Sequence, residues 1–178
     1  MRPRPPLSAP ALLLTAALLA GCAAPAPLAT VPQVDLARYA GAWYEVAMLP
    51  NRFQKQCVAD TQARYRLDGD QVEVVNRCRN ADGSVVSAQG HAKVVEGSGN
   101  AKLRVSFFWP FYGDYWVLAL DPGYRQVLVG APSRDYAWVL SRTPQMDEAA
   151  LQALLNQAAE LGFDKAAFQR TPQTQPLD

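Results

Sequence analysis

The sequence predicts an all-β protein, an eight-stranded antiparallel up-and-down barrel with one C-terminal α-helix packed on the outside. Short runs of alternating apolar and polar residues recur between about residues 41 and 141, and glycine-containing turns separate them. A helical spacing of leucines follows only after the last of these runs. Closing such strands into a barrel removes the unpaired edges that an open sheet exposes, so we predict closure.

The composition is that of one domain. With 178 residues, of which 49% are hydrophobic and 19% charged, the chain can bury a single ordinary core. The formal net charge of +1 gives no basic bias. Because phosphate-binding domains show a marked positive balance, we expect no nucleic-acid partner.

The N-terminus has the composition of a secretion signal. Two arginines precede a short apolar run at residues 11–19, which is too short to span a bilayer as a helix and ends in small residues. The following Leu-Ala-Gly-Cys, which ends at Cys22, resembles the cleavage box of bacterial lipoproteins, in which the cysteine is lipidated. An ordinary signal peptide followed by a chance cysteine is the alternative. Alanine rather than aspartate after Cys22 implies, by this resemblance, the outer membrane of a Gram-negative bacterium, with the protein facing the periplasm.

The remaining cysteines fit an oxidising compartment. If Cys22 carries lipid, Cys57 and Cys78 are left as an even pair. They lie almost symmetrically about the turn at Asp68-Gly69, so a short slip or bulge brings them to cross-strand distance. We predict a disulfide between them, and the alternative is two reduced, buried thiols.

The predicted organisation follows the chain. We expect a signal peptide at 1–21, the lipidated cysteine and an Ala/Pro tether at 22–34, the barrel with its helix at 35–170, and a C-terminal tail at 171–178.

The first predicted strand begins at Gly41, after a short helical turn at residues 35–39. Along this strand Trp43, Glu45, Ala47 and Leu49 share one face. The other strands are expected at residues 58–67, 71–77, 84–95, 102–108, 115–120, 126–130 and 136–141.

One helix is predicted after the strands. Asp147 is its expected N-cap, and apolar residues recur at helical spacing until Gly162 ends the run. These apolar residues, which must pack on the outside of the barrel, are Leu151, Leu154, Leu155 and Ala158.

Trp43 and Arg142 are expected to meet, because the first and last strands are neighbours in a closed barrel. A guanidinium lying across an indole contributes about 2 kcal/mol when desolvated. With Gly41, this pair resembles the first and third motifs of the lipocalin family. Gly113-Asp114-Tyr115 stands where the second motif usually has Thr-Asp-Tyr, so the local hydrogen bonding there departs from the family pattern. The resemblance is greatest to the bacterial outer-membrane lipocalins and next to apolipoprotein D, through residues 43–47, 105–113 and 135–144.

The resemblance implies a cup that binds a small lipophilic molecule, a fatty acid or lysophospholipid in the bacterial members, and it allows a homodimer. An eight-stranded barrel has room for one such ligand. On the last strand, parity places Tyr136, Trp138 and Leu140 inside with Arg142, and on the sixth strand we expect Tyr115, Val117 and Ala119 inside, because small residues leave room. The resulting ligand-contacting residues are Glu45, Ala47, Tyr65, Val105, Phe107, Trp109, Tyr115, Tyr136 and Trp138, whereas Gly41, Trp43 and Arg142 are expected to be structural.

Several of these residues have an alternative role. Tyr65, Phe107 and Trp138 could equally fill the core without touching a ligand. Glu45 in an apolar cup should be paired with a cation or a tyrosine hydroxyl, or have a raised pKa. The aromatic loop at residues 109–112 is expected to gate the mouth, contact a second copy of the chain, or face a membrane.

The main functional hypothesis is a lipid-binding lipocalin, anchored to the outer membrane, that stores or transports lipid for envelope maintenance under stress. A lipocalin-fold enzyme acting on a lipophilic substrate is one alternative, but His91 is the one histidine and has no matched Ser or Cys partner. We therefore expect no catalytic residues, no metal and no cofactor. The other alternative is an envelope protein with a filled barrel that binds a partner.

Overall fold

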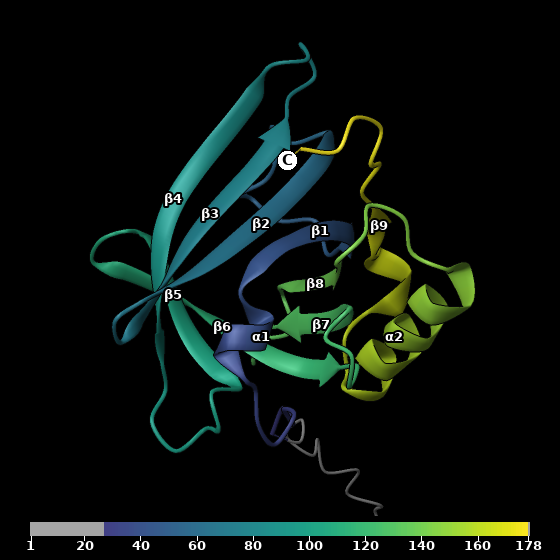
Figure 1. Ribbon diagram of the computed structural model, residues 1–178. Coiled ribbons are helices and arrows are strands. Elements are labelled where there is room, and N and C mark those ends of the chain that lie inside the picture. The colour runs from purple at the N-terminus through teal and green to yellow at the C-terminus, as the bar shows by residue number, and fades with distance from the viewer. Residues whose placement is uncertain (1–26, 178) are drawn as a thin grey trace, which may run out of the picture.

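The computed structural model describes residues 27–177, so the predicted signal peptide and Cys22 lie outside the described residues. The chain forms a closed antiparallel barrel of eight strands with one short extra strand, as the sequence predicts for the barrel (Figure 1). β1 pairs with both β2 and β8, which closes the sheet. The barrel strands are β1 (Gly41–Met48), β2 (Ala59–Asp68), β3 (Gln71–Arg79), β4 (Val85–Val94), β5 (Lys102–Phe108), β6 (Phe111–Leu120), β7 (Gln126–Gly130) and β8 (Ala137–Ser141).

The remaining elements close one end of the barrel or pack against its outer side. Helix α1 (Leu36–Tyr39) precedes β1, and the predicted C-terminal helix is α2 (Glu148–Glu160). A short 3-10 helix, η1 (Lys165–Ala167), leads to β9 (Gln169–Arg170), which pairs with β1 and was not predicted. Within residues 27–177, no helix is long and apolar enough to cross a membrane.

One end of the barrel is closed by α1 and the residues before it. The side chain of Asp35 caps α1 by accepting hydrogen bonds from the backbone N–H groups of Ala37 and Arg38. Leu28 and Val34 are buried, and the Val34 N–H donates to the carbonyl of Gly99 at 2.8 Å. The folded part therefore begins within the predicted tether, because single apolar side chains in a Pro-rich segment carry no periodic signal.

The structure has two apolar cores, one on each side of the barrel wall. The inner core contains Trp43, Val74, Val117 and Leu140. The outer core lies beneath α2, whose side-chain cap is Asp147, as predicted. Burying each leucine of α2 against the strands contributes roughly 1.5–3 kcal/mol, so the helix is held mainly by this contact.

Two β-bulges overturn part of the predicted alternation. β1 changes register against β8 between Glu45 and Ala47, and Ala47 and Leu49 consequently pack in the outer core. β6 changes register against β7 between Val117 and Ala119, so Ala119 also packs against the outer core. Because one extra residue moves the following side chains to the other face, the interior placement of Ala47 and Ala119 was wrong.

The C-terminal residues 171–177 pack across β1 and β2. The Gln173 amide donates to the carbonyls of Glu45 and Thr61, both at 2.9 Å. Asp60, which is fully buried, accepts hydrogen bonds from the backbone of Thr174 and Gln175. The predicted tail is therefore a strap that belongs to the fold.

Candidate ligand-binding site

The closed end of the barrel is built on Trp43, which is fully buried, with its indole N–H donating to the Tyr39 carbonyl at 2.8 Å. The Arg142 guanidinium carbon lies 4.0 Å from the Trp43 ring centroid, and its nitrogens donate to the carbonyls of Arg38 and Ala42. Gly41 has a φ of 98°, and a side chain there would start 3.2 Å from Arg142. The structure thus brings the three motif residues together as a floor.

Above the floor, the structure places Tyr65, Val105, Tyr115 and Trp138 with the inner core. Phe107 lies higher, at the rim, where its ring covers the inward side of Gly90 and 44% of its surface is exposed. Between these walls is an apolar cavity of about 20 Å³, lined from α1 and from β2 through β6. Pockets that hold drug-sized ligands measure roughly 300–1,000 Å³. Binding an acyl chain therefore requires side chains to move.

Three tyrosine hydroxyls meet inside the lower barrel. The Tyr115 hydroxyl lies 2.7 Å from that of Tyr39 and 3.0 Å from that of Tyr65. Burial raises the pKa of Tyr65 to about 12, and burial also raises the pKa of Tyr39 and of Tyr115 well above the usual value. All three hydroxyls therefore keep their protons at neutral pH. Sequence reasoning missed Tyr39 because it comes from α1, whose four residues carry no strand alternation.

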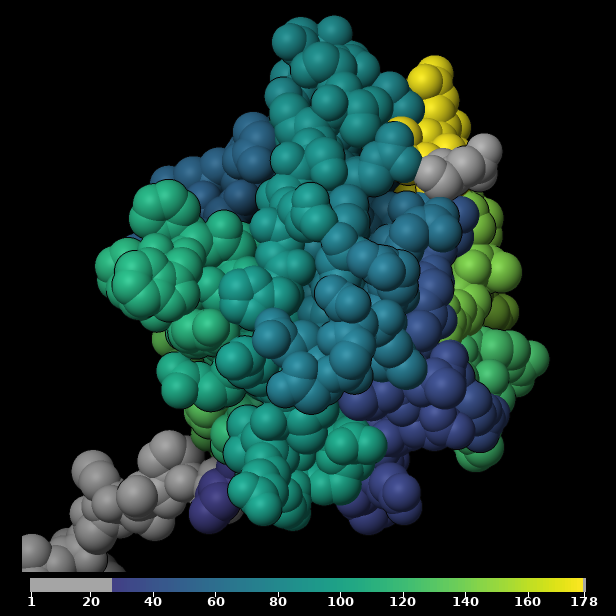
Figure 2. Space-filling view, turned by 60° about the vertical axis from the view of Figure 1, so that its left-hand side comes forward, coloured from purple at the N-terminus to yellow at the C-terminus, as the bar shows by residue number. Residues whose placement is uncertain are grey.

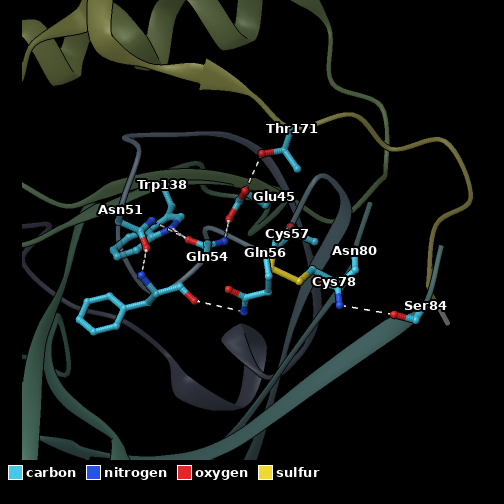
Figure 3. Close-up of a disulfide and its surroundings, with 12 residues drawn as sticks. Glu45, Asn51, Gln54, Gln56, Cys57, Cys78, Asn80, Ser84, Trp138 and Thr171 are labelled. Atoms are coloured by element: carbon cyan, nitrogen blue, oxygen red, sulfur yellow. Dashed lines mark hydrogen bonds between the residues drawn. A yellow bond between two sulfur atoms is a disulfide. The ribbon is translucent and has the colours of Figure 1, made fainter. Parts of the chain in front are cut away.

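The mouth is covered by the loop at residues 49–58, which we call the lid. Gln54 fixes it, as Figure 3 shows: its carbonyl oxygen accepts from the indole of Trp138 at 2.8 Å, and its amide donates to Glu45 at 2.7 Å. The predicted disulfide between Cys57 and Cys78 is confirmed, with a Cα–Cα distance of 5.5 Å, and it ties the lid to β3. No sequence pattern marks Gln54, because a single glutamine in a loop has no periodicity.

Glu45 lies beneath the lid with 3% of its surface exposed. Its carboxylate accepts hydrogen bonds from Gln54 and from the hydroxyl of Thr171. Burial raises the pKa of Glu45, and the two hydrogen bonds oppose that rise. The raised pKa agrees with one of the expectations for this carboxylate. Its hydrogen-bond donors are a neutral amide and a threonine hydroxyl, not the expected cation or tyrosine.

Aromatic side chains surround the mouth. Tyr136 stacks on Trp138 with ring centroids 6.3 Å apart and also contacts Phe53 at 5.7 Å. Trp109 stands apart at the tip of the β5–β6 hairpin, 77% exposed, and so it does not line the interior. Figure 2 shows this tip, in green, projecting from the left-hand edge of the surface.

The predicted aromatic loop is shorter than expected. Trp109 and Pro110 form a tight turn, and the following Phe111 and Tyr112 belong to β6. Tyr112 lies on the outer face, where its hydroxyl is 3.2 Å from a ring nitrogen of His91. Among residues 27–177, no group of three or more His, Cys, Asp or Glu side chains is placed to hold a metal ion.

Comparison with known proteins identifies the family. The model of a lipocalin-like domain matches residues 34–173. The chain is 40% identical to temperature-induced lipocalin-1 of Arabidopsis thaliana, over 81% of this chain and 82% of that protein. It is 39% identical to the outer membrane lipoprotein Blc of Escherichia coli K12, over 85% and 88%, and 35% identical to apolipoprotein D of Macaca fascicularis, over 68% of each.

Solved structures share the fold at lower identity. Insecticyanin from the tobacco hornworm superposes with a TM-score of 0.68 at 22% identity, covering 82% of this chain and 84% of that one. Apocrustacyanin C2 gives a TM-score of 0.65 at 16% identity, covering 78% and 79%. With the closed barrel, the Trp43 and Arg142 floor and these relatives, the chain belongs to the lipocalin family.

Proposed function

We propose that the protein binds a small lipophilic molecule, a fatty acid or a lysophospholipid, inside the barrel. The observation that carries this proposal is the apolar interior beneath a lid, with Tyr65, Val105 and Trp138 on its walls and a sealed floor. A small apolar molecule in such a space gains the burial of its acyl chain.

The same proposal places the protein at the outer membrane of a Gram-negative bacterium. It is supported by the Leu-Ala-Gly-Cys sequence at Cys22 and by the similarity to proteins named outer membrane lipoprotein Blc. Acyl chains on Cys22 would anchor the protein facing the periplasm, where it would store or transport lipid for envelope maintenance under stress.

We propose binding rather than catalysis as the activity. His91 contacts Tyr112 on the outer face of the barrel, away from the cavity. The cavity walls are apolar apart from tyrosine hydroxyls, which contact one another rather than a carboxylate or an imidazole in the described hydrogen bonds.

Lipid titration tests this function. The purified protein, freed of lipid, is titrated with lysophospholipid and with fatty acid while tryptophan fluorescence is recorded. Because the Trp138 indole donates a hydrogen bond to Gln54 of the lid, we expect lipid binding to change its environment. The tryptophan fluorescence should therefore be quenched saturably, at micromolar or tighter affinity. Heat-unfolded protein is the control, and the absence of saturable binding by both lipids contradicts the proposal.

A second candidate is a partner-binding envelope protein with a filled barrel. The small cavity of about 20 Å³ favours it, as does the exposed hairpin tip, where Phe108, Trp109 and Phe111 are 75%, 77% and 70% exposed. A homodimer through this tip is the simplest partner. Under this alternative, sedimentation shows a dimer that Trp109→Ser dissociates, and neither lipid binds.

A further inference from the structure

We propose that the hydroxyls of Tyr39, Tyr65 and Tyr115 form a carboxyl-binding subsite near the floor of the barrel. A fatty acid would enter with its carboxyl group toward this subsite and leave its acyl chain toward the mouth. This inference rests on the proposed lipid-binding function and adds the chemistry and the orientation of the ligand.

Counting the hydroxyl protons shows that one tyrosine O–H is available to donate a hydrogen bond to a ligand. The three hydroxyls carry three protons, and the contacts among them, Tyr39 to Tyr115 and Tyr65 to Tyr115, use two. Whichever hydroxyl donates, one O–H proton has no acceptor among the hydrogen bonds of the described tyrosines. A buried donor without an acceptor is costly, so a ligand that brings an acceptor oxygen is favoured here.

The surroundings of the tyrosines select a carboxyl group. The raised pKa values keep the hydroxyls as donors, which can bond a carboxylate or a carboxylic acid. The positive charge of Arg142, on the floor side, acts on Tyr39 and Tyr65 and would attract a carboxylate. Glu45, on the lid side, also acts on Tyr65, and when ionised it would repel a carboxylate placed beneath the lid.

The opposite orientation fits the described residues less well. A methyl end at the floor would leave the free hydroxyl proton facing a hydrocarbon. It would also bring the ligand carboxylate toward Glu45, whose hydrogen bonds already come from Gln54 and Thr171. The unpaired hydroxyl proton and the repulsion between the two carboxylates both disfavour an acyl chain that points to the floor.

Position-specific quenching tests the orientation. Trp43 reports on the floor because its ring centroid lies 4.9 Å from that of Tyr39. In a variant with Trp109→Phe, Trp116→Phe and Trp138→Phe, it is the remaining one of the four tryptophans. We expect stearic acid with a nitroxide at carbon 5 to quench Trp43 more strongly at saturation than stearic acid with the nitroxide at carbon 16. Stronger quenching by the carbon-16 label overturns the proposal.

A second experiment tests the donors. The variant with Tyr39→Phe, Tyr65→Phe and Tyr115→Phe keeps the rings and removes all three hydroxyls together, so no hydroxyl is left without its partner. We expect its stearate affinity to fall about 10-fold or more, and by a larger factor than its affinity for the neutral probe N-phenyl-1-naphthylamine. Tyr112→Phe, on the outer face, is the matched control.

The outcomes separate this inference from the function on which it rests. Equal stearate affinity in the triple variant and the wild type overturns the carboxyl subsite and leaves lipid binding intact. Failure of the wild type to bind stearate overturns the subsite as well. Failure to bind either stearate or lysophospholipid overturns the proposed function.

Discussion

Trp43 and Trp138 are both indoles of the inner core, but their partners give them different roles. Trp43 is fully buried between Tyr39 and Arg142, whereas Trp138 is partly buried and bonds the lid. We expect Trp43→Ala to lower the free energy of unfolding by roughly 3–5 kcal/mol, because it leaves a large cavity. Trp138→Ala should mainly weaken lipid binding. Urea denaturation and lipid titration of both variants measure this, and the reverse pattern contradicts the division.

Glu45 should make stability depend on pH. Because its folded pKa is raised above the ordinary value of 4.5, the folded state holds this proton more tightly than the unfolded state. Its contribution to stability is therefore fully present below pH 4.5 and is lost as the pH rises through the folded pKa. We expect Glu45→Gln to flatten this part of the profile in urea denaturation from pH 4 to 8. Glu96→Gln, in an exposed turn, should leave it unchanged.

Gly113 offers a way to block the barrel without disturbing its core. Gly113 pairs with Val105 and lies two residues before Tyr115, so it faces the same side of β6 as Tyr115. A Cβ atom at this position would meet no atom within 4 Å. Gly113 thus leaves open space near the mouth. We expect Gly113→Leu to abolish lipid binding while the free energy of unfolding stays within about 1 kcal/mol of the wild type. Unchanged lipid affinity would mean that the ligand does not pass this point.

At the scale of elements, the strap at residues 171–177 connects β1 and β2 in addition to their own strand pairing. It supplies backbone donors to the buried carboxylate of Asp60 and a carbonyl to the amide of Gln62. Ending the chain after Arg170 removes these partners and uncovers this part of β1 and β2, while Asp60 keeps its ion pair with Arg79. We expect the free energy of unfolding to fall by about 2–5 kcal/mol. Gln175→Ala keeps the backbone donor and should cost far less in the same denaturation assay.

The strands and hairpins could be predicted from the sequence because alternation and turn residues are local signals. Asp68-Gly69 makes the β2–β3 turn, where Gly69 has a φ of 61°, and the pairing around it brings Cys57 to Cys78. The bulges that turn Ala47 and Ala119 outward have no such signal, because they depend on how neighbouring strands fit around the barrel.

The candidate site was predictable only in part. Tyr65, Val105, Tyr115 and Trp138 follow from parity and from the family resemblance, and they lie in the inner core. The partners that give the site its polarity come from irregular segments: Tyr39 from α1, Gln54 from the lid and Thr171 from the strap. Contacts between irregular segments that are distant in sequence depend on the complete fold, so no local sequence pattern predicts them.

At the scale of the whole molecule, the proposed membrane attachment depends on one residue. Under the proposed function, acyl chains on Cys22, which ends the Leu-Ala-Gly-Cys sequence, form the anchor. We expect Cys22→Ser to move the protein from the outer-membrane fraction to another cell fraction. Lipid binding by the purified variant should be unchanged, since the described barrel begins after this residue. Retention of the variant in the outer-membrane fraction would contradict the anchor.

The entry of the chain at the closed end decides which way such an anchored barrel faces. Leu28 is already packed, and it lies six residues after Cys22, so a fully extended connection reaches only about 20 Å. Figure 1 shows the N-terminal segment leaving beside α1, at the end opposite the C-terminus. Under the proposed function, a lipidated Cys22 would keep the floor next to its own leaflet, with the mouth toward the aqueous space. The proposed molecule would then exchange lipid with the periplasm or with a facing bilayer rather than with the leaflet that holds it.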